Sequence, residues 1–386
     1  MKTPTWQYFS LDEYRGRMDA LRRRMEAKGV DIMLAHTPEN LYYLTGYQTP
    51  GYYWYQTLVV PLDREPIFIT RLLEDASVQH LSWVEESRPY GDSDDWIART
   101  RDVVAEFGAE SSRIGIEKDS WFLTLRDFEG LSSALPSATF VDCSGLVEDG
   151  RMIKSPTELD YMRQAARTAE AGVDAGIEAC TVGASENDVA AAIHDAQIRA
   201  GSEYTGLPLF ITSGPRSALG HATWYRQELK AGDTVFLEIP GCVNRYHAAI
   251  MRNVFLGEPP DRMLRATEAM AKALEETMGF IKPGVTAHDA HHFCRQTIEN
   301  AGLGVRLDHR AAYCIGIGFA PDWGEGHIIS INDGEHRPLQ AGMTFHLIPL
   351  VSIPGLTSVG VSETVLVTET GCEALTANVD RKLFVR

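Results

Sequence analysis

The chain lacks the features of a secreted, membrane-spanning or disulfide-stapled protein. No apolar run approaches the ~18 residues needed to cross a bilayer, and the first 30 residues hold no apolar signal segment. Cysteines are few, scattered and without a CxxC pair: Cys143, Cys180, Cys242, Cys294, Cys314 and Cys372. We therefore expect reduced thiols, no membrane partner and a cytoplasmic location.

Basic residues are also in deficit. There are 36 Lys and Arg against 53 Asp and Glu, which gives a formal net charge of −17. Excess negative charge argues against nucleic acid or an anionic membrane surface as a partner, and solubility explains the acidity itself.

The length of 386 residues suggests two domains of ~100 to 200 residues each. Residues 11–29 have helical spacing and end on Gly29, ahead of the apolar run VDIMLA. The runs QTLVVPL, EPIFIT, RIGIEK and ATFVDC follow, separated by polar, helix-like stretches. This alternation predicts an α/β domain over residues 1–150.

A second domain is predicted over residues 151–386. Ser155, Pro156 and Glu158 are the residue types of a helix N-cap, first turn and capping box, and apolar residues recur at helical spacing after them. Within this domain VGASENDVAAAIHDAQIRAG resembles PGVTAHDAHHFCRQTIENAG, 101 residues later. The matching turn, cap, carboxylate and stop residues are Gly183, Ser185, Asp188 and Gly201 in one copy and Gly284, Thr286, Asp289 and Gly302 in the other. We predict an internal duplication into two α+β halves that share one sheet, with the site at their junction.

The second copy contains the sequence HDAHH. His288 and His292 lie four residues apart, a spacing that metal sites on helices use. An exposed face at a helix start explains the same residues without a metal, so we assign no metal ligand here.

Motifs along nearly the whole chain together resemble the pita-bread family, which includes methionine aminopeptidase, aminopeptidase P, prolidase and creatinase. In order they are PENLYYLTGY, RMIKSPTELDYMR, GHATW, GDTVFLEIPGCVNRYHAAIMRN, GMTFHLIP and VSETVLVT. The resemblance implies a creatinase-type α/β N-terminal domain and an α+β pita-bread catalytic domain with an internal pseudo-two-fold repeat. It also implies a homodimer in which Tyr52 and Trp54 reach the partner's site, although a buried aromatic hairpin would explain these two residues as well.

Metal-dependent members of the family hold two divalent ions with two Asp, one His and two Glu. The matching positions here are Glu238, Ala249, Tyr313 (or Ile315 in a shifted register), Ile348 and Glu363. At three of the five positions the side chain is not the family's ligand, so the resemblance implies an enzyme without metal or other cofactor.

Within the family, EIPGCVNRYH, PDWGE and GMTFH are similar to the ectoine hydrolases, metal-independent relatives of creatinase, although Asn253 departs from the pattern. This similarity implies hydrolysis of a C–N bond in a small cyclic amidine, ectoine or hydroxyectoine, to an N-acetyl-diaminobutyrate. Three alternatives stay open: hydrolysis of another guanidino or amidino compound, an Xaa-Pro peptidase, and a non-catalytic binding protein.

The same resemblance assigns three catalytic residues. His221 in GHATW is expected to move a proton, and Glu238 to attack the amidine carbon or orient water. Glu363 is expected to grip the amidinium together with Glu238, through paired charge-assisted hydrogen bonds.

Other residues are expected to line the substrate pocket. Arg245 is a candidate clamp for the substrate carboxylate, or else part of a structural salt bridge. Asp322 and Trp323 either line the pocket or form a packed turn. The remaining candidates are Tyr246, His247, Tyr313 and His346.

Overall fold

A computed structural model describes residues 1–353 and 357–386 of the chain. The chain divides into two compact units, Met1–Arg151 and Met152–Arg386, one residue after the predicted boundary. Among the described residues, no helix is both long and apolar enough to cross a membrane.

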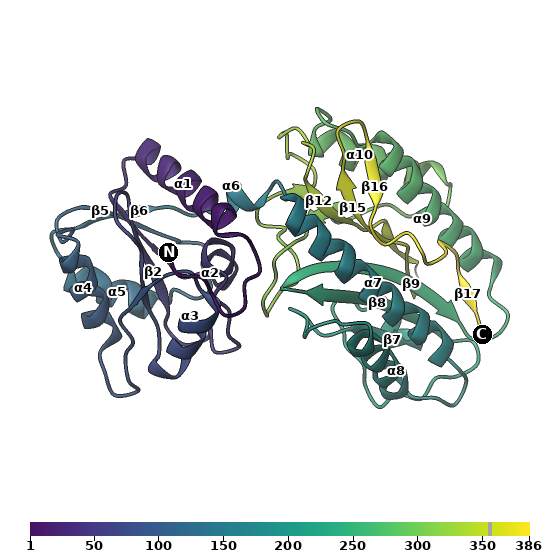
Figure 1. Cartoon of the computed structure of the whole chain (residues 1–386). Coiled ribbons are helices and arrows are strands. Elements are labelled where there is room, and N and C mark those ends of the chain that lie inside the picture. Colours follow the sequence, from purple (N-terminus) through teal and green to yellow (C-terminus); the bar gives the residue numbers. More distant parts are fainter. Residues whose placement is uncertain (354–356) are drawn as a thin grey trace. The chain divides into compact units, whose positions relative to one another are not determined.

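The N-terminal unit is a mixed six-stranded sheet in the order β4-β3-β2-β1-β5-β6 with helices around it (Figure 1). Strand β1 pairs antiparallel with β2 and parallel with β5. Helix α1 ends where Gly29 adopts φ 66°, a left-handed conformation that glycine tolerates. The strands are β1 (Ile32–Ala35), β2 (Thr57–Pro61), β3 (Ile67–Ile69), β4 (Glu86–Ser87), β5 (Arg113–Ile116) and β6 (Thr139–Asp142). The helices are α1 (Leu11–Lys28), α2 (Pro38–Thr45), η1 (Leu72–Glu74), α3 (Asp75–Leu81), α4 (Trp96–Glu106), α5 (Leu125–Ala134) and α6 (Glu148–Arg151).

The C-terminal unit carries its helices on two main sheets. One sheet has the order β17-β9-β8-β7, the other β11-β10-β12-β15-β16, and β13 pairs with β14. The prediction of one shared sheet is therefore wrong, because backbone hydrogen bonding separates the strands into these groups. The strands are β7 (Phe210–Ser213), β8 (Thr234–Val243), β9 (Tyr246–Phe255), β10 (Ala312–Cys314), β11 (Ser330–Ile331), β12 (Thr344–Leu347), β13 (Leu350–Ile353), β14 (Thr357–Gly360), β15 (Glu363–Val367), β16 (Cys372–Ala374) and β17 (Phe384–Val385). The helices are α7 (Pro156–Ala179), α8 (Glu186–Arg199), η2 (Gly214–Ala218), α9 (Asp261–Phe280) and α10 (Ala287–Asn300).

The internal duplication is visible in local hydrogen bonds. Ser185 caps α8 and Thr286 caps α10, each accepting from the backbone N–H three residues on. Ahead of each cap, a glycine donates its N–H to a leucine carbonyl at the same distance: Gly183 to Leu229 and Gly284 to Leu339, both 2.9 Å. The two halves therefore repeat one supersecondary unit.

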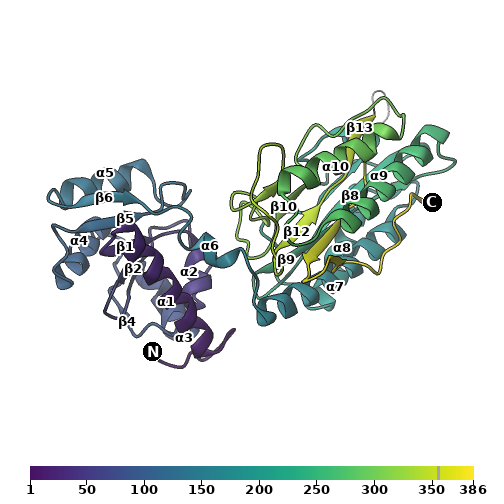
Figure 2. The ribbon, with the colours of Figure 1, turned by 90° about the horizontal axis from the view of Figure 1, so that it is seen from above.

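Strands β8 and β9 form a long hairpin whose two faces have different neighbours. Helix α7 runs along this hairpin (Figures 1 and 2). The core on that side consists of Ala169, Val173 and Ile177 of α7 with Leu237, Ile239, Ile250 and Val254 of the hairpin. Because successive strand residues point to opposite faces, Glu238 lies on the face away from α7. Its register partners there are Phe210 and Met251.

Candidate active site

Glu238 provides a buried carboxylate on the inner face of the β8–β9 hairpin. The residue is 8% exposed, and burial raises the pKa of its carboxyl group to about 8. Nδ1 of His346 lies 3.8 Å from its Oε1. In the free protein at neutral pH, Glu238 is therefore mostly protonated.

A chain of hydrogen bonds borders Glu238. Tyr313 of β10 and His346 of β12 are register partners, so their side chains share a face. Nε1 of Trp323 donates to the Tyr313 hydroxyl at 2.7 Å, and that hydroxyl lies 2.8 Å from Nδ1 of His346. Nε2 of His346 lies 2.7 Å from the Ser362 hydroxyl. Burial lowers the pKa of His346 to about 3, so the ring is neutral. Both of its nitrogens have hydrogen-bond partners.

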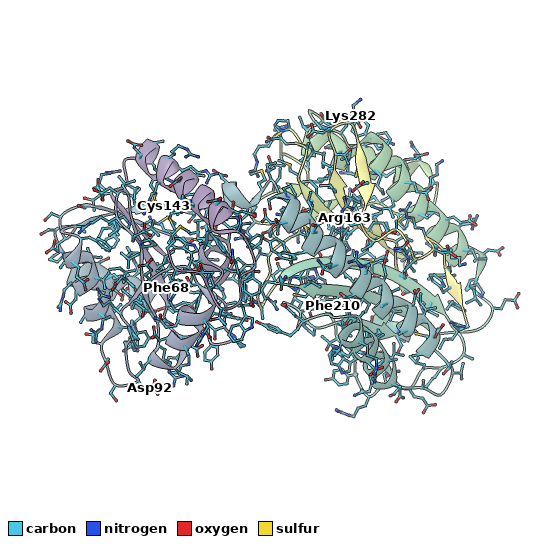
Figure 3. All side chains as sticks on the ribbon, viewed as in Figure 1. Phe68, Asp92, Cys143, Arg163, Phe210 and Lys282 are labelled. Atoms are coloured by element: carbon cyan, nitrogen blue, oxygen red, sulfur yellow. The ribbon has the colours of Figure 1, made fainter. Side chains whose placement is uncertain are left out.

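Phe210 connects this network to His221. Phe210 comes from β7 and is labelled in Figure 3. Its ring centroid lies 5.1 Å from that of Trp323 and 5.4 Å from that of His221, on which it stacks. His221 is exposed in the segment after η2. The structure thus brings together five of the predicted site residues: His221, Glu238, Tyr313, Trp323 and His346. Phe210 lies between His221 and the other four.

The structure does not bring Glu363 to this group. Oε1 of Glu363 accepts from Nη2 of Arg252 at 2.7 Å and from Nε of Arg381 at 3.0 Å, and Oε2 accepts from the Thr376 hydroxyl. Glu363 pairs in register with Leu347, whose side chain lies in the core beneath α9 and α10. The predicted pairing with Glu238 is therefore wrong: alternation along the strand turns Ser362 toward His346 and Glu363 to the opposite face.

Arg245 and Tyr246 also serve the fold rather than line the Glu238 site. Arg245 occupies the two-residue β8–β9 turn with φ 62°, and its guanidinium donates to the carbonyls of Gly318 and Tyr204 at 2.7 Å each. The Tyr246 hydroxyl donates to Glu158 of α7 at 2.6 Å, on the face away from Glu238. Arg245 is fully buried and its Nη1 lies 3.6 Å from Oε2 of Glu203, which is the structural salt bridge of the alternative interpretation.

His247 and Asp322 hold the loops beside Trp323. Nε2 of His247 accepts from the Gly206 N–H at 3.0 Å, and burial lowers the pKa of the ring to about 3. Oδ1 of Asp322 accepts from the Gly324 N–H at 2.9 Å and closes the turn that carries Trp323. Both residues position the site from its edge.

Tyr52 and Trp54 belong to the N-terminal unit. The Tyr52 ring packs edge-on against Phe122, with centroids 5.4 Å apart. Trp54 is 40% exposed and lies under the guanidinium of Arg71, 4.7 Å from the ring centroid. Trp54 is thus not part of a buried hairpin, and the approach to a partner's site stays a prediction.

Three residues of this region were not predicted from the sequence: Phe210, Ser362 and Arg252. Phe210 is one of several apolar residues in GLPLFITSG, and nothing in that run singles it out. Ser362 could have been found from the alternation of V-S-E-T-V, in which Ser362 and Thr364 share one face and Glu363 takes the other.

Family models agree with this fold. The model of metallopeptidase family M24 matches residues 160–369, and that of the creatinase/prolidase N-terminal domain matches residues 17–153. The chain belongs to metallopeptidase family M24. Among M24 relatives, an ectoine hydrolase of Halomonas elongata is 29% identical over 98% of both chains. An uncharacterized hydrolase/peptidase of Sinorhizobium fredii is 33% identical over 96% of both.

Solved M24 structures share the architecture. A dipeptidase from Pyrococcus horikoshii superposes with a TM-score of 0.84 at 25% identity, over 96% of this chain and 100% of its own. A prolidase from Thermococcus sibiricus gives a TM-score of 0.87 at 22% identity, over 98% and 100%. The chain thus has the predicted creatinase-type N-terminal domain and pita-bread catalytic domain.

The donor atoms around Glu238 do not fit the two-metal centre that the family name implies. Ala249 and Ile348 offer no donor side chain, and the Glu363 carboxylate is held by two arginines. Both nitrogens of His346 are engaged by Tyr313 and Ser362. Within residues 1–353 and 357–386, the one group of three or more ligand side chains lies elsewhere, at His288, His292 and Asp333. Two hard cations need more carboxylates than this site has.

We predict that Glu363→Gln destabilises the fold. The change leaves the fully buried Arg252 without its counter-charge, which costs about 3 kcal/mol of unfolding free energy. Glu373→Gln is the control: its partner Arg163 lies at 2.5 Å, both side chains are 44% exposed, and the loss should stay below about 1 kcal/mol. Urea unfolding of the two variants makes the comparison. Weakened substrate binding by Glu363→Gln at unchanged stability would instead support its predicted role in the site.

Proposed function

We propose that this M24 protein hydrolyses a C–N bond in a small cationic amidine without a metal, and that the substrate is ectoine or hydroxyectoine. The observation that carries the proposal is the single buried carboxylate of Glu238, bordered by neutral aromatic and polar groups where metal-dependent relatives need ligands. The similarity to an ectoine hydrolase over 98% of the chain supports the substrate class.

The charge of an amidinium suits this site. An arriving cation lowers the pKa of Glu238 from its raised value, because it compensates the charge that burial disfavours. The carboxylate so formed accepts a charge-assisted hydrogen bond from the amidinium N–H. Binding of the substrate thereby prepares the base.

The reaction adds one water across the amidine and breaks one C–N bond. Glu238 orients the water or attacks the amidine carbon itself, and water then releases the acyl group. The oxygen ends on carbon, and His221 delivers a proton to the departing nitrogen. The products are an amide and an amine, with no oxidant or metal in the balance.

The network beside Glu238 keeps the site rigid. Tyr313 accepts from Trp323 and is bonded to His346, which is bonded to Ser362. A buried network in which each member has a partner holds its side chains in one geometry, so little reorganisation is needed in the transition state.

A substrate panel tests the reaction class. Chelator-treated protein is incubated with ectoine, hydroxyectoine, creatine and an Xaa-Pro dipeptide, and amine release is followed. We expect turnover of ectoine or hydroxyectoine that added divalent metal does not raise. Turnover of the dipeptide alone, restored by metal after chelation, would instead establish the Xaa-Pro dipeptidase activity that a Pyrococcus furiosus relative, 25% identical over 93% of this chain, carries in its name.

Two substitutions separate base from proton donor. Glu238→Gln should weaken binding and abolish turnover, because an amide supplies neither a negative charge nor a base. His221→Ala should leave binding intact and lower kcat by about 10²- to 10⁴-fold. His194→Ala on α8, which packs on Trp224, is the histidine control and should keep full activity.

The pH profile of the wild type adds a check on Glu238. Since kcat/KM reports the ionisation of groups in the free enzyme, it should rise about tenfold per pH unit below the pKa of Glu238 and level off near about pH 8. A flat wild-type profile between pH 6 and pH 8, together with full activity in Glu238→Gln, would dismiss the mechanism.

We further propose a homodimer that uses exposed aromatic residues of the N-terminal unit. Tyr53 and Trp121 are 74% and 70% exposed, and Trp54 lies next to Tyr53 with ring centroids 6.1 Å apart. Large exposed aromatics of this kind are typical of interfaces. Sedimentation should show a dimer that Trp54→Ser weakens and Trp6→Ser, on another exposed tryptophan, does not. A fully active monomer would end this proposal.

A further inference from the structure

We propose that His288 and His292 of α10, with Asp333 from the turn after β11, form a surface site for one divalent transition-metal ion of the Zn²⁺ type. The ligand atoms of the three side chains all lie within 4.8 Å of one another. This site is separate from the Glu238 network, with which it shares no residue. The sequence shows only the two histidines, and the fold adds the carboxylate.

The distances suit a small ion. Oδ1 of Asp333 lies 3.2 Å from Nδ1 of His288 and 3.1 Å from Nε2 of His292. In a tetrahedral site with Zn–N and Zn–O bonds of about 2.0 to 2.1 Å, neighbouring ligand atoms are about 3.3 Å apart. Two edges of such a tetrahedron are therefore already in place, and the two histidine nitrogens lie within 4.8 Å of each other.

The backbone holds the carboxylate opposite the histidine pair. Side chains at positions i and i+4 of a helix lie on one face, so His288 and His292 project together. The segment that follows Asp333 is fixed along the first turn of α10: the His288 N–H donates to the Glu335 carbonyl at 2.7 Å and the Ala287 N–H to that of Arg337 at 3.1 Å. The ligands therefore come from two rigidly joined segments.

An ion can reach this site and find further donors. Asp333 and His292 have side chains 64% and 45% exposed, and that of His288 is 28% exposed. The His336 ring lies 4.7 Å from that of His288, close enough to supply a fourth ligand in place of water. The Gly334 N–H donates to Nδ1 of His288 at 3.1 Å, a hydrogen bond that a metal ion would replace. Imidazole and carboxylate donors together favour Zn²⁺, Ni²⁺ or Cu²⁺ over Mg²⁺ or Ca²⁺.

The test is calorimetric titration of chelator-stripped, full-length protein with Zn²⁺ and with Mg²⁺ at about pH 7.5, because metal ligands must be deprotonated. We expect one Zn²⁺ per chain at micromolar affinity, no comparable Mg²⁺ binding, and a higher unfolding temperature with Zn²⁺ present. His292→Ala and Asp333→Ala should each weaken Zn²⁺ binding at least about tenfold. His80→Ala, an exposed histidine of the N-terminal unit, should leave it unchanged.

The outcomes also separate this site from the proposed active site. Glu238→Gln should bind Zn²⁺ as the wild type does, whatever its effect on turnover. Zn²⁺ binding that survives His292→Ala and Asp333→Ala, or that is absent at millimolar Zn²⁺, overturns the proposal. Loss of binding in Glu238→Gln alone would place the metal at Glu238 and would contradict both this site and the metal-free mechanism.

Discussion

The site depends on one constraint, the opposite direction of successive side chains along a strand. In the β8–β9 hairpin this puts Glu238 on the inner face and Arg252 on the face covered by α7. At β15 the same alternation sends Glu363 to Arg252 and Ser362 to His346. Glu238 therefore lies beside Tyr313 and His346, with the Arg310 guanidinium 4.4 Å from the Tyr313 ring centroid, while the Glu363 carboxylate is paired with arginines on the opposite face. A two-metal centre instead needs several carboxylates together on the inner faces.

An isolated buried carboxylate has a thermodynamic consequence. The pKa of Glu238 is raised to about 8, above its usual value, so between roughly pH 4.5 and pH 8 the folded protein retains a proton that the unfolded chain has lost. In this window the contribution of Glu238 to stability falls as pH rises. In the proposed reaction, a cationic substrate compensates the carboxylate charge that burial disfavours. In that proposal, substrate recognition and activation of the base are one electrostatic event.

Local signals predicted much of the fold, because they depend on a few neighbouring residues. Ser155, Ser185 and Thr286 each cap the helix expected of them, and Gly29 ends α1. Which face a side chain takes was less predictable. Glu363 was assigned one position away from the residue that faces the site, and a shift of one residue in a strand reverses every side chain.

The sequence also did not predict which segments, distant along the chain, meet in the folded protein. Asp333 joins His288 and His292 only because the segment after β11 is hydrogen-bonded along the start of α10, 40 residues or more away in sequence. Trp323 reaches Tyr313 through a turn closed by Asp322.

This chain keeps the M24 fold but has other side chains at positions where the family pattern places metal ligands. Alanine and isoleucine at ligand positions remove hard donors, and the space beside Glu238 is taken by Tyr313, His346 and Ser362, whose hydrogen bonds satisfy one another. A charged His346 would form an ion pair with Glu238, whose Oε1 lies 3.8 Å from Nδ1 of the ring. The lowered pKa of His346, about 3, prevents this. Burial thus disfavours the charged form of both groups: it lowers the pKa of the histidine and raises that of the glutamate.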